Sequence, residues 1–323
     1  MLHSDPSSLK DESAGDDAIA DIDMNIFLLC RNPVSAQQAI RSLTDSSNMH
    51  PKRVHLNLIH VPFDASNRTS VKAAIASLSQ SISDGKIING LLLNAGGFTS
   101  DRTGTITSSG TTIIAETNLI GHAVLVDGLI QSKKLQHGSR VIFSGSEAGM
   151  GEPFAIKWGD KLDDYVNILN GKAYRTKNNT SKYSPQDAYG HIKGMMAFYV
   201  YALAKQHPDI YFATVSPGSS KDTDLIDQGS FSGAFKLFVK GFIRFIRLSG
   251  QHSVEVGAAR YIDALMANGS GGYSYKSGTF VSSKKGYIGE VCDATELKKG
   301  KAFGDKAKQD LVFEAVQMFI ISR

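Results

Sequence analysis

The chain has 323 residues, of which 41% are hydrophobic and 20% are charged, and its formal net charge is +4 at pH 7. Such a chain can bury a substantial core, either as one large α/β domain or as two smaller ones. No long tract of lysine and arginine interleaves with aromatic residues, so nucleic acid is not expected as a partner. The two cysteines, Cys30 and Cys292, provide neither a disulfide framework nor a zinc-binding spacing, which fits a reducing compartment.

Residues 1–23 are acidic and polar and lack the apolar core of a secretion signal. No stretch approaches the roughly 18 apolar residues of a membrane span. We therefore expect an irregular N-terminal segment and a cytoplasmic protein, with peripheral membrane contact as an alternative. The oligomeric state stays open, and a homo-oligomer is one option.

Short apolar runs, bounded by turn residues, predict buried strands. The predicted strands cover residues 25–30, 54–61, 88–93, 140–144, 210–215 and 277–281. Between them, helical patterns cover residues 70–82, 111–130, 188–205, 231–248 and 253–266. Strands that alternate with helices of this length predict right-handed crossovers and a doubly wound parallel sheet, an α/β fold. In such a sheet ligands bind beyond the carboxyl ends of the strands.

Tyr189 and Lys193 stand four residues apart in the predicted helix 188–205. This spacing places a phenol and an ammonium on one helical face, where the positive charge would stabilise the phenolate and lower the pKa of the tyrosine. A tyrosine so placed can act as a general acid or base. Alone, such a pair more often marks a solvated helix surface, so the neighbouring motifs must decide.

Motifs of small residues follow several predicted strands, and small residues let backbone approach a ligand closely. In chain order the motifs are NAGG at 94–97, TNLIG at 117–121, SGSEAG at 144–149, the Tyr189 and Lys193 pair, and VSPG at 215–218. This order resembles the short-chain dehydrogenase/reductase superfamily, nearest its retinol-dehydrogenase-like and protochlorophyllide-reductase-like branches. The resemblance implies a single Rossmann-like domain over residues 24–323, with an insert at 150–186 and a lid at 219–250.

The resemblance implies catalytic roles for four residues. Tyr189 would be the acid/base that protonates a carbonyl or deprotonates an alcohol, and Lys193 would support it and bind the nicotinamide ribose. Ser146 would orient the substrate oxygen, and it is chosen over Ser144 because the family's serine lies three residues before a glycine. Asn118 matches the asparagine that binds a water in a proton relay; the alternative is an asparagine that kinks its helix.

The resemblance also implies cofactor contacts. Besides Tyr189 and Lys193, these fall at Asp64, Asn94, Ala95, Gly96, Pro217, Gly218 and Thr223. Asp64 matches the acid that contacts the adenine amino group, and its alternative role is a helix cap. At the end of the first strand Cys30 precedes Arg31, and a guanidinium without a neighbouring carboxylate favours a 2′-phosphate, hence NADP(H). Arg31 could instead be an ordinary surface residue.

One expected part of the family pattern is missing. A nucleotide-binding member begins with a strand and a Thr-Gly-x-x-x-Gly-x-Gly turn, yet the first eighty residues contain only Gly15. That turn brings backbone amides to the pyrophosphate at a helix N-terminus, and its strand covers the edges of two neighbouring strands. A truncated or misassembled coding sequence, a degenerate pseudoenzyme and a partner chain that supplies the strand each account for this. The first is favoured because the motifs after Met24 are intact.

The segments near the substrate are expected to be the insert and the lid. Trp158, Tyr165 and Tyr174 lie in the insert, which we expect to be irregular and to border the substrate pocket. Helix 231–248 is two-faced: Lys236, Lys240, Arg244 and Arg247 lie opposite Phe231, Phe238, Phe242 and Phe245. It could lie on an anionic membrane surface, or it could be a lid that packs its phenylalanines on the protein, which we favour.

Both alternatives for that helix imply an apolar substrate. The sequence thus predicts an NADP(H)-dependent oxidoreductase that interconverts a carbonyl and an alcohol on a lipophilic small molecule. A catalytically inactive scaffold protein that binds a partner or a membrane is the main alternative, and a double-bond reductase is the other.

Overall fold

The computed structural model describes residues 22–47, 54–98, 101, 103–151, 156–174, 183–219, 251–266 and 275–321. The chain divides into two compact units, Met1–Val61 and Pro62–Arg323, and each is described by itself. Thr223 and the predicted helix 231–248 lie outside the described residues, as do residues 1–21.

The smaller unit contains two of the predicted strands and one helix that was not predicted. Strand β1 (Ile22–Cys30) pairs with β2 (Val54–Pro62), and helix α1 (Pro33–Ser47) lies between them in the chain. The Asn32 side chain accepts hydrogen bonds from the backbone N–H of Val34 and Ser35, and Pro33 takes the first helical position. Helix α1 is largely exposed, so it lacks the broad apolar face that the prediction relied on.

The larger unit is built on a five-stranded sheet in the order β3-β4-β5-β6-β7, with the first four strands parallel and β7 antiparallel. The strands are β3 (Gly90–Leu93), β4 (Arg140–Ser144), β5 (Tyr211–Val215), β6 (Phe280–Lys285) and β7 (Ile288–Asp293). The helices are α2 (Arg68–Ser81), α3 (Ile113–Ala115), α4 (Gly121–Gln131), α5 (Leu162–Leu169), α6 (Pro185–Gln206), α8 (Val254–Met266) and α9 (Lys306–Ile321). The sequence did not predict β7, α5 or α9, and β6 begins later than predicted.

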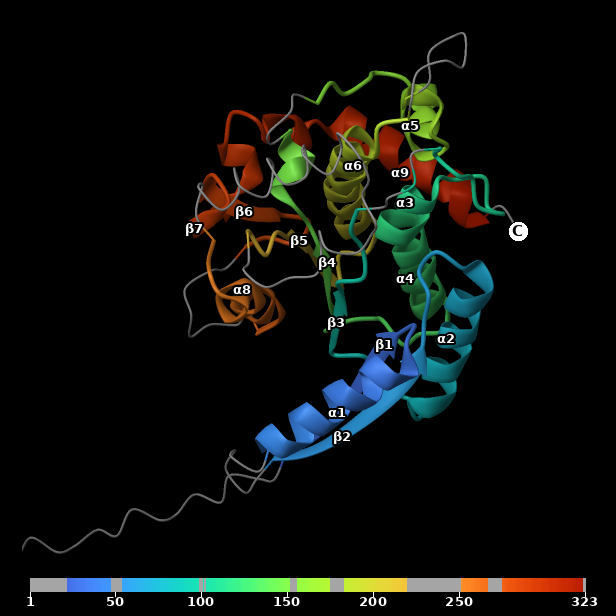
Figure 1. Cartoon of the computed structure of the whole chain (residues 1–323), viewed down its shortest axis with the longest axis vertical. Coiled ribbons are helices and arrows are strands. Elements are labelled where there is room, and N and C mark those ends of the chain that lie inside the picture. Colours follow the sequence, from blue (N-terminus) through green and yellow to red (C-terminus); the bar gives the residue numbers. More distant parts are fainter. Residues whose placement is uncertain are drawn as a thin grey trace, which may run out of the picture. The chain divides into compact units, whose positions relative to one another are not determined.

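Helices cover both faces of this sheet. Successive side chains of a strand point to opposite sides, so the apolar residues of these strands need cover on each face. One face carries Ile142, Ala213, Val215 and Val281, which pack against Tyr261 and Ala264 of α8. Phe143 points to the other face and meets Tyr199 of α6 edge-on, with ring centroids 6.4 Å apart. Helices α8 and α6 accordingly flank the sheet on opposite sides (Figure 1). The predicted α/β fold with a mostly parallel, Rossmann-like sheet is confirmed.

Strand β3 lies at an edge of this sheet. Among the described residues it is hydrogen-bonded to β4 alone. Leu91 and Leu93 are buried, whereas Leu92 is 38% exposed. That the first strand of the family pattern is missing stays a prediction.

One helical segment, residues 113–131, is long and apolar enough to cross a membrane, contrary to the sequence estimate. It comprises α3, a π-helical segment (Glu116–Ile120) and α4. Most of its apolar window (72%) is buried inside the protein, which is typical of a core helix.

Helix α4 approaches the backbone near α2 so closely that only glycine fits at its first residue. A Cβ atom on Gly121 would lie 2.0 Å from the carbonyl oxygen of Ala65. A Cβ on Gly304, by contrast, would have no neighbour within 4 Å.

We therefore expect Gly121→Ala to lower the free energy of unfolding by about 1–3 kcal/mol, because backbone must move to relieve the overlap. Gly304→Ala is the matched control and should leave stability within about 0.5 kcal/mol of the parent. Urea unfolding of the three proteins measures this. Equal midpoints for Gly121→Ala and the parent would contradict the close approach.

Candidate active site

Two residues at the start of helix α6 favour helix formation there. The Ser184 hydroxyl accepts a hydrogen bond from the backbone N–H of Asp187, and Pro185 takes the first helical position. The helix carries Tyr189 and Lys193 one turn apart, and both side chains are buried. The predicted helix is therefore confirmed, whereas the alternative of a solvated surface pair is wrong.

Lys193 reaches from α6 to the carboxyl end of β4. Its ammonium donates a hydrogen bond of 2.7 Å to the carbonyl oxygen of Ser144. Burial lowers the pKa of Lys193 to about 7. Glycines permit this approach: a Cβ on Gly149 would lie 2.8 Å from the backbone nitrogen of Gly194.

Tyr189 lies between an aromatic ring and the catalytic serine candidate. The Phe98 ring stacks on it, with centroids 4.1 Å apart and an interplanar angle of 27°. Burial raises the pKa of Tyr189 to about 12; a hydrogen bond with Ser146 lowers it and the charge of Glu147 raises it further. The expectation that Lys193 lowers this pKa is wrong here, because desolvation dominates and the ammonium is directed at a carbonyl.

The two serines of the SGSEAG motif have different partners. Ser146 shares the hydrogen bond with Tyr189 and also accepts one from the backbone N–H of Ala148, at 3.2 Å. The Ser144 hydroxyl instead lies 2.6 Å from the hydroxyl of Tyr261 on α8. The structure thus brings Ser146 to the tyrosine, and the catalytic roles of both residues stay predictions.

Asn118 lies in the π-helical segment Glu116–Ile120, which widens the helix at this point. Its amide donates to the carbonyl oxygens of Gly97 and Ile114, both at 3.0 Å, and its oxygen accepts from the N–H of Gly97 at 2.9 Å. A Cβ on Gly96 would lie 2.5 Å from that oxygen and 3.5 Å from the ammonium nitrogen of Lys193. Asn118 therefore fixes the loop after β3, and the irregular helix agrees with the kinking alternative.

The predicted cofactor segment after β3 is open to solvent: Asn94, Ala95 and Gly96 are all exposed. His122, which the sequence analysis missed, holds this segment through a ring nitrogen 2.5 Å from the carbonyl oxygen of Ala95. Burial lowers the pKa of His122 to about 4, so the ring is neutral at physiological pH. Its position four residues after Asn118, on the same helical face, is the signal that could have indicated it.

The Pro217–Gly218 turn follows β5, as predicted. Gly218 has a φ of 73°, which favours glycine, and its N–H donates to the Ser216 hydroxyl at 3.1 Å. A Cβ on Gly218 would meet the Tyr287 carbonyl oxygen at 2.5 Å. The turn is thus closely packed, and its contact with a cofactor stays a prediction.

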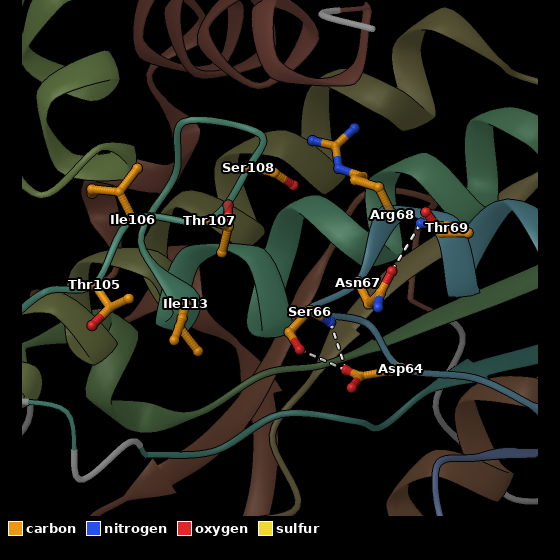
Figure 2. A pocket seen from close by; sticks show the side chains of 10 residues that line it. All are labelled: Asp64, Ser66, Asn67, Arg68, Thr69, Thr105, Ile106, Thr107, Ser108 and Ile113. Atoms are coloured by element: carbon orange, nitrogen blue, oxygen red, sulfur yellow. Dashed lines mark hydrogen bonds between the residues drawn. The ribbon is translucent and has the colours of Figure 1, made fainter.

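Asp64 lies beside a pocket of about 350 Å³. The pocket is lined by Asp64, residues 66–69, residues 105–108 and Ile113. Figure 2 shows the Asp64 carboxylate turned toward Ser66. The carboxylate accepts hydrogen bonds from the N–H and the hydroxyl of Ser66, at 2.9 and 2.7 Å. Asn67, not Asp64, caps α2, so the cap alternative for Asp64 is wrong, while the adenine contact stays a prediction. Tyr189, Lys193 and Ser146 do not line this pocket.

The insert is more ordered than expected, since it contains α5. The Trp158 ring packs edge-on against Phe198 of α6 with centroids 5.0 Å apart, and Tyr165 is fully buried and donates to the Gly159 carbonyl oxygen. Of the three aromatic residues expected at the substrate pocket, only Tyr174 packs against the cluster that includes Tyr189.

Arg31 follows β1 in the smaller unit, where it is exposed, and its contact with a 2′-phosphate stays a prediction. Among the described residues, no group of three or more His, Cys, Asp or Glu side chains could hold a metal ion.

No family model and no curated protein matches the chain. Solved structures with a similar fold include L-sorbose reductase from Gluconobacter frateurii complexed with NADPH and L-sorbose, at 16% identity and a TM-score of 0.54, covering 82% of this chain and 87% of that one. A 3-alpha-hydroxysteroid dehydrogenase from Pseudomonas sp. B-0831, complexed with NADH, has 16% identity and a TM-score of 0.50 over 74% of this chain and 89% of its own. These likenesses establish the class of fold, a Rossmann-like α/β fold that dehydrogenases and reductases also have.

The buried lysine generates a pH-dependent prediction. Between about pH 7 and 10.5 an unfolded Lys193 binds a proton that the folded one does not, so stability rises with pH across this window. In Lys193→Met this contribution is absent. As pH rises, the free energy of unfolding of the parent should therefore increase relative to that of the variant by at most about 1.4 kcal/mol per pH unit.

Urea unfolding of both proteins at pH 7 and pH 9 measures the difference, and other titrating groups cancel in the comparison. A difference that does not change with pH would show that the buried ammonium keeps its proton.

Proposed function

We propose that the chain is an NADP(H)-dependent oxidoreductase of the short-chain dehydrogenase/reductase superfamily, interconverting a carbonyl and an alcohol on a lipophilic small molecule. The observation that carries the proposal is the meeting of Tyr189, Ser146 and Lys193 at the carboxyl end of β4. In open α/β sheets this end of the strands is where ligands bind. The structural relatives complexed with NADPH and NADH support a dinucleotide as cofactor.

The proposed roles follow from the protonation states. The raised pKa keeps Tyr189 a phenol at neutral pH, the form that can donate its proton to a carbonyl oxygen during reduction. Ser146, already hydrogen-bonded to that phenol, would hold the substrate oxygen beside it. In the opposite direction the same tyrosine would accept the alcohol proton, and the Lys193 ammonium would stabilise the phenolate.

The residues near Lys193 fit one end of a dinucleotide. Asn94, Ala95 and Gly96 are exposed, and a Cβ on Gly96 would lie 3.5 Å from the ammonium nitrogen of Lys193, so a side chain there would fill space beside the lysine. Lys193 would hold the nicotinamide ribose, and the Pro217–Gly218 turn would hold the carboxamide. The cofactor, when bound, supplies or accepts the hydride. The glycine-rich turn that would hold the pyrophosphate is not in the first eighty residues.

A lipophilic substrate is supported by the surroundings of Tyr189. Phe98 stacks on the tyrosine, and Tyr174 and Tyr183 lie in the same cluster. Such aromatic surfaces bind apolar or planar molecules more tightly than hydrated ones. The predicted lid over 219–250 would extend this surface.

Tyr189→Phe tests the proposed chemistry. The variant keeps the ring stack but loses the proton donor, so turnover should fall by a factor of about 10²–10⁴ while NADPH binding is largely retained. Tyr211→Phe, at the opposite end of β5, is the matched control and should turn over like the parent. Reduction of apolar ketones, followed by NADPH absorbance, measures both. Unchanged turnover in Tyr189→Phe would refute the role of Tyr189.

NADPH affinity tests the cofactor half of the proposal. Calorimetry should show weak binding by the chain as given and tighter binding by a version extended upstream with a strand and glycine-rich turn, because the turn supplies amides for the pyrophosphate. If neither protein binds NADPH, the proposal that the chain is an NADP(H)-dependent enzyme is refuted.

The absent glycine turn also favours a second candidate, a catalytically inactive protein that binds a membrane or a partner. For that candidate, cosedimentation with anionic vesicles should depend on the basic residues within 231–248, and no turnover should appear in any version.

A further inference from the structure

Glu147 is a buried carboxylate directly beside the site. It follows Ser146 in the chain and is only 2% exposed. Its oxygens accept hydrogen bonds from the Ser216 hydroxyl at 2.5 Å and from the hydroxyl and N–H of Ser283 at 3.0 and 3.2 Å. Burying a carboxylate is costly unless it is fully hydrogen-bonded, and these three bonds supply that compensation.

The positive counterpart of this carboxylate is Arg260 on α8, which is 8% exposed. Its guanidinium donates to the Ser216 carbonyl oxygen at 3.1 Å, to the Ser283 hydroxyl at 3.0 Å and to the Gly289 carbonyl oxygen at 2.9 Å. Glu147 and Arg260 therefore share Ser216 and Ser283 as partners. The network ties together the segment after β4, the end of β5 and strand β6.

Ser216 passes this constraint to the Pro217–Gly218 turn. Its hydroxyl donates to Glu147 and accepts the N–H of Gly218. A Cβ on Gly218 would lie 2.8 Å from a guanidinium nitrogen of Arg260, so the turn also rests on that side chain. One carboxylate is thus bonded to the turn on one side and adjoins Ser146 on the other.

We propose that Glu147 is a positioning residue that holds the Pro217–Gly218 turn and Ser146 at a fixed spacing beside Tyr189. The inference rests on the proposed function, in which the turn and the serine serve cofactor and substrate. Glu147 acts through Ser216 and Ser146 and touches neither reacting atom.

The negative charge of Glu147 has a second consequence, because it opposes ionisation of Tyr189. The titratable groups around Tyr189 are Lys193 on the same helix, Glu147 in the turn after β4, Tyr261 on α8, and Tyr174 and Tyr183 of the adjoining aromatic cluster. Burial, together with the charge of Lys193, lowers the pKa of His122 on α4, so this ring is neutral at physiological pH. Removing the Glu147 charge therefore lowers the pKa of Tyr189.

Glu147→Gln separates charge from shape, since the amide is isosteric but neutral. We expect the titration midpoint of Tyr189, followed by NMR of 13C-labelled tyrosine and assigned with Tyr189→Phe, to move down by roughly half a unit to one unit. Exchange of the Gly218 amide proton should accelerate about tenfold or more, because the amide presents a donor where Ser216 needs an acceptor.

Ser283→Ala is the matched control, because it removes one hydrogen bond to Glu147, that from the hydroxyl, and keeps the charge. It should leave the Tyr189 midpoint in place. If Glu147→Gln does not fold, Glu147→Asp takes its place: it should keep the midpoint and still accelerate exchange at Gly218.

Unchanged exchange at Gly218 in the Glu147 variants would overturn the proposal. These readouts need neither cofactor nor turnover, so they stand apart from the proposed function, whose failure appears as absent NADPH binding by both the parent and the version extended upstream. Where the parent is active, Glu147→Gln should also raise KM for NADPH more than it lowers kcat. The rate of alcohol oxidation rises with pH as Tyr189 ionises, and in the variant this rise should occur at lower pH.

Discussion

The hydrogen bond from the buried Lys193 ammonium to the Ser144 carbonyl oxygen is the constraint on which the site depends. An ammonium without a carboxylate partner is costly to bury, and here one carbonyl and the local backbone must compensate for lost water. The bond joins α6 to the end of β4, so the helix that carries Tyr189 cannot shift without breaking it. The free-energy cost of burying the charge is reflected in the lowered pKa of Lys193.

That bond is possible only because backbone approaches backbone. Gly149 and Gly194 let the turn after β4 lie directly on α6, and Gly96 leaves room between Asn118 and Lys193. The π-helical segment then turns Asn118 toward Gly97. The glycines of the motifs therefore let secondary structures approach one another closely, and the proposed site lies where these structures meet.

The sequence predicted the parallel sheet, and it predicted that Tyr189 and Lys193 lie on one helical face, because both features depend on local patterns. Short apolar runs predicted β4 and β5, and the spacing of four placed Tyr189 and Lys193 on one helical face. The pKa of Tyr189 could not be predicted this way, since periodicity shows which residues share a face and not how deeply that face is buried. The segments that were missed have half-buried or mixed faces: α1 is mostly exposed, and β7 is an antiparallel edge strand. Glu147 was missed because its partners, Ser216 and Ser283, lie far away in the chain.

The proposed proton chemistry and the proposed dinucleotide binding would depend on different physical features of this chain. The first needs a desolvated phenol held near a serine and a lysine, and the larger unit provides that arrangement with buried polar groups that are hydrogen-bonded to one another. The second needs backbone amides at a helix N-terminus, and the glycines that would allow it are not in the first eighty residues. Burying a charge costs free energy, so any change that removes either Glu147 or Arg260 leaves the other charge uncompensated and destabilises the fold. Its presence beside Tyr189 is therefore better explained by a requirement for fixed geometry at the ends of β4 and β5 than by fold stability, which apolar side chains could supply at lower cost.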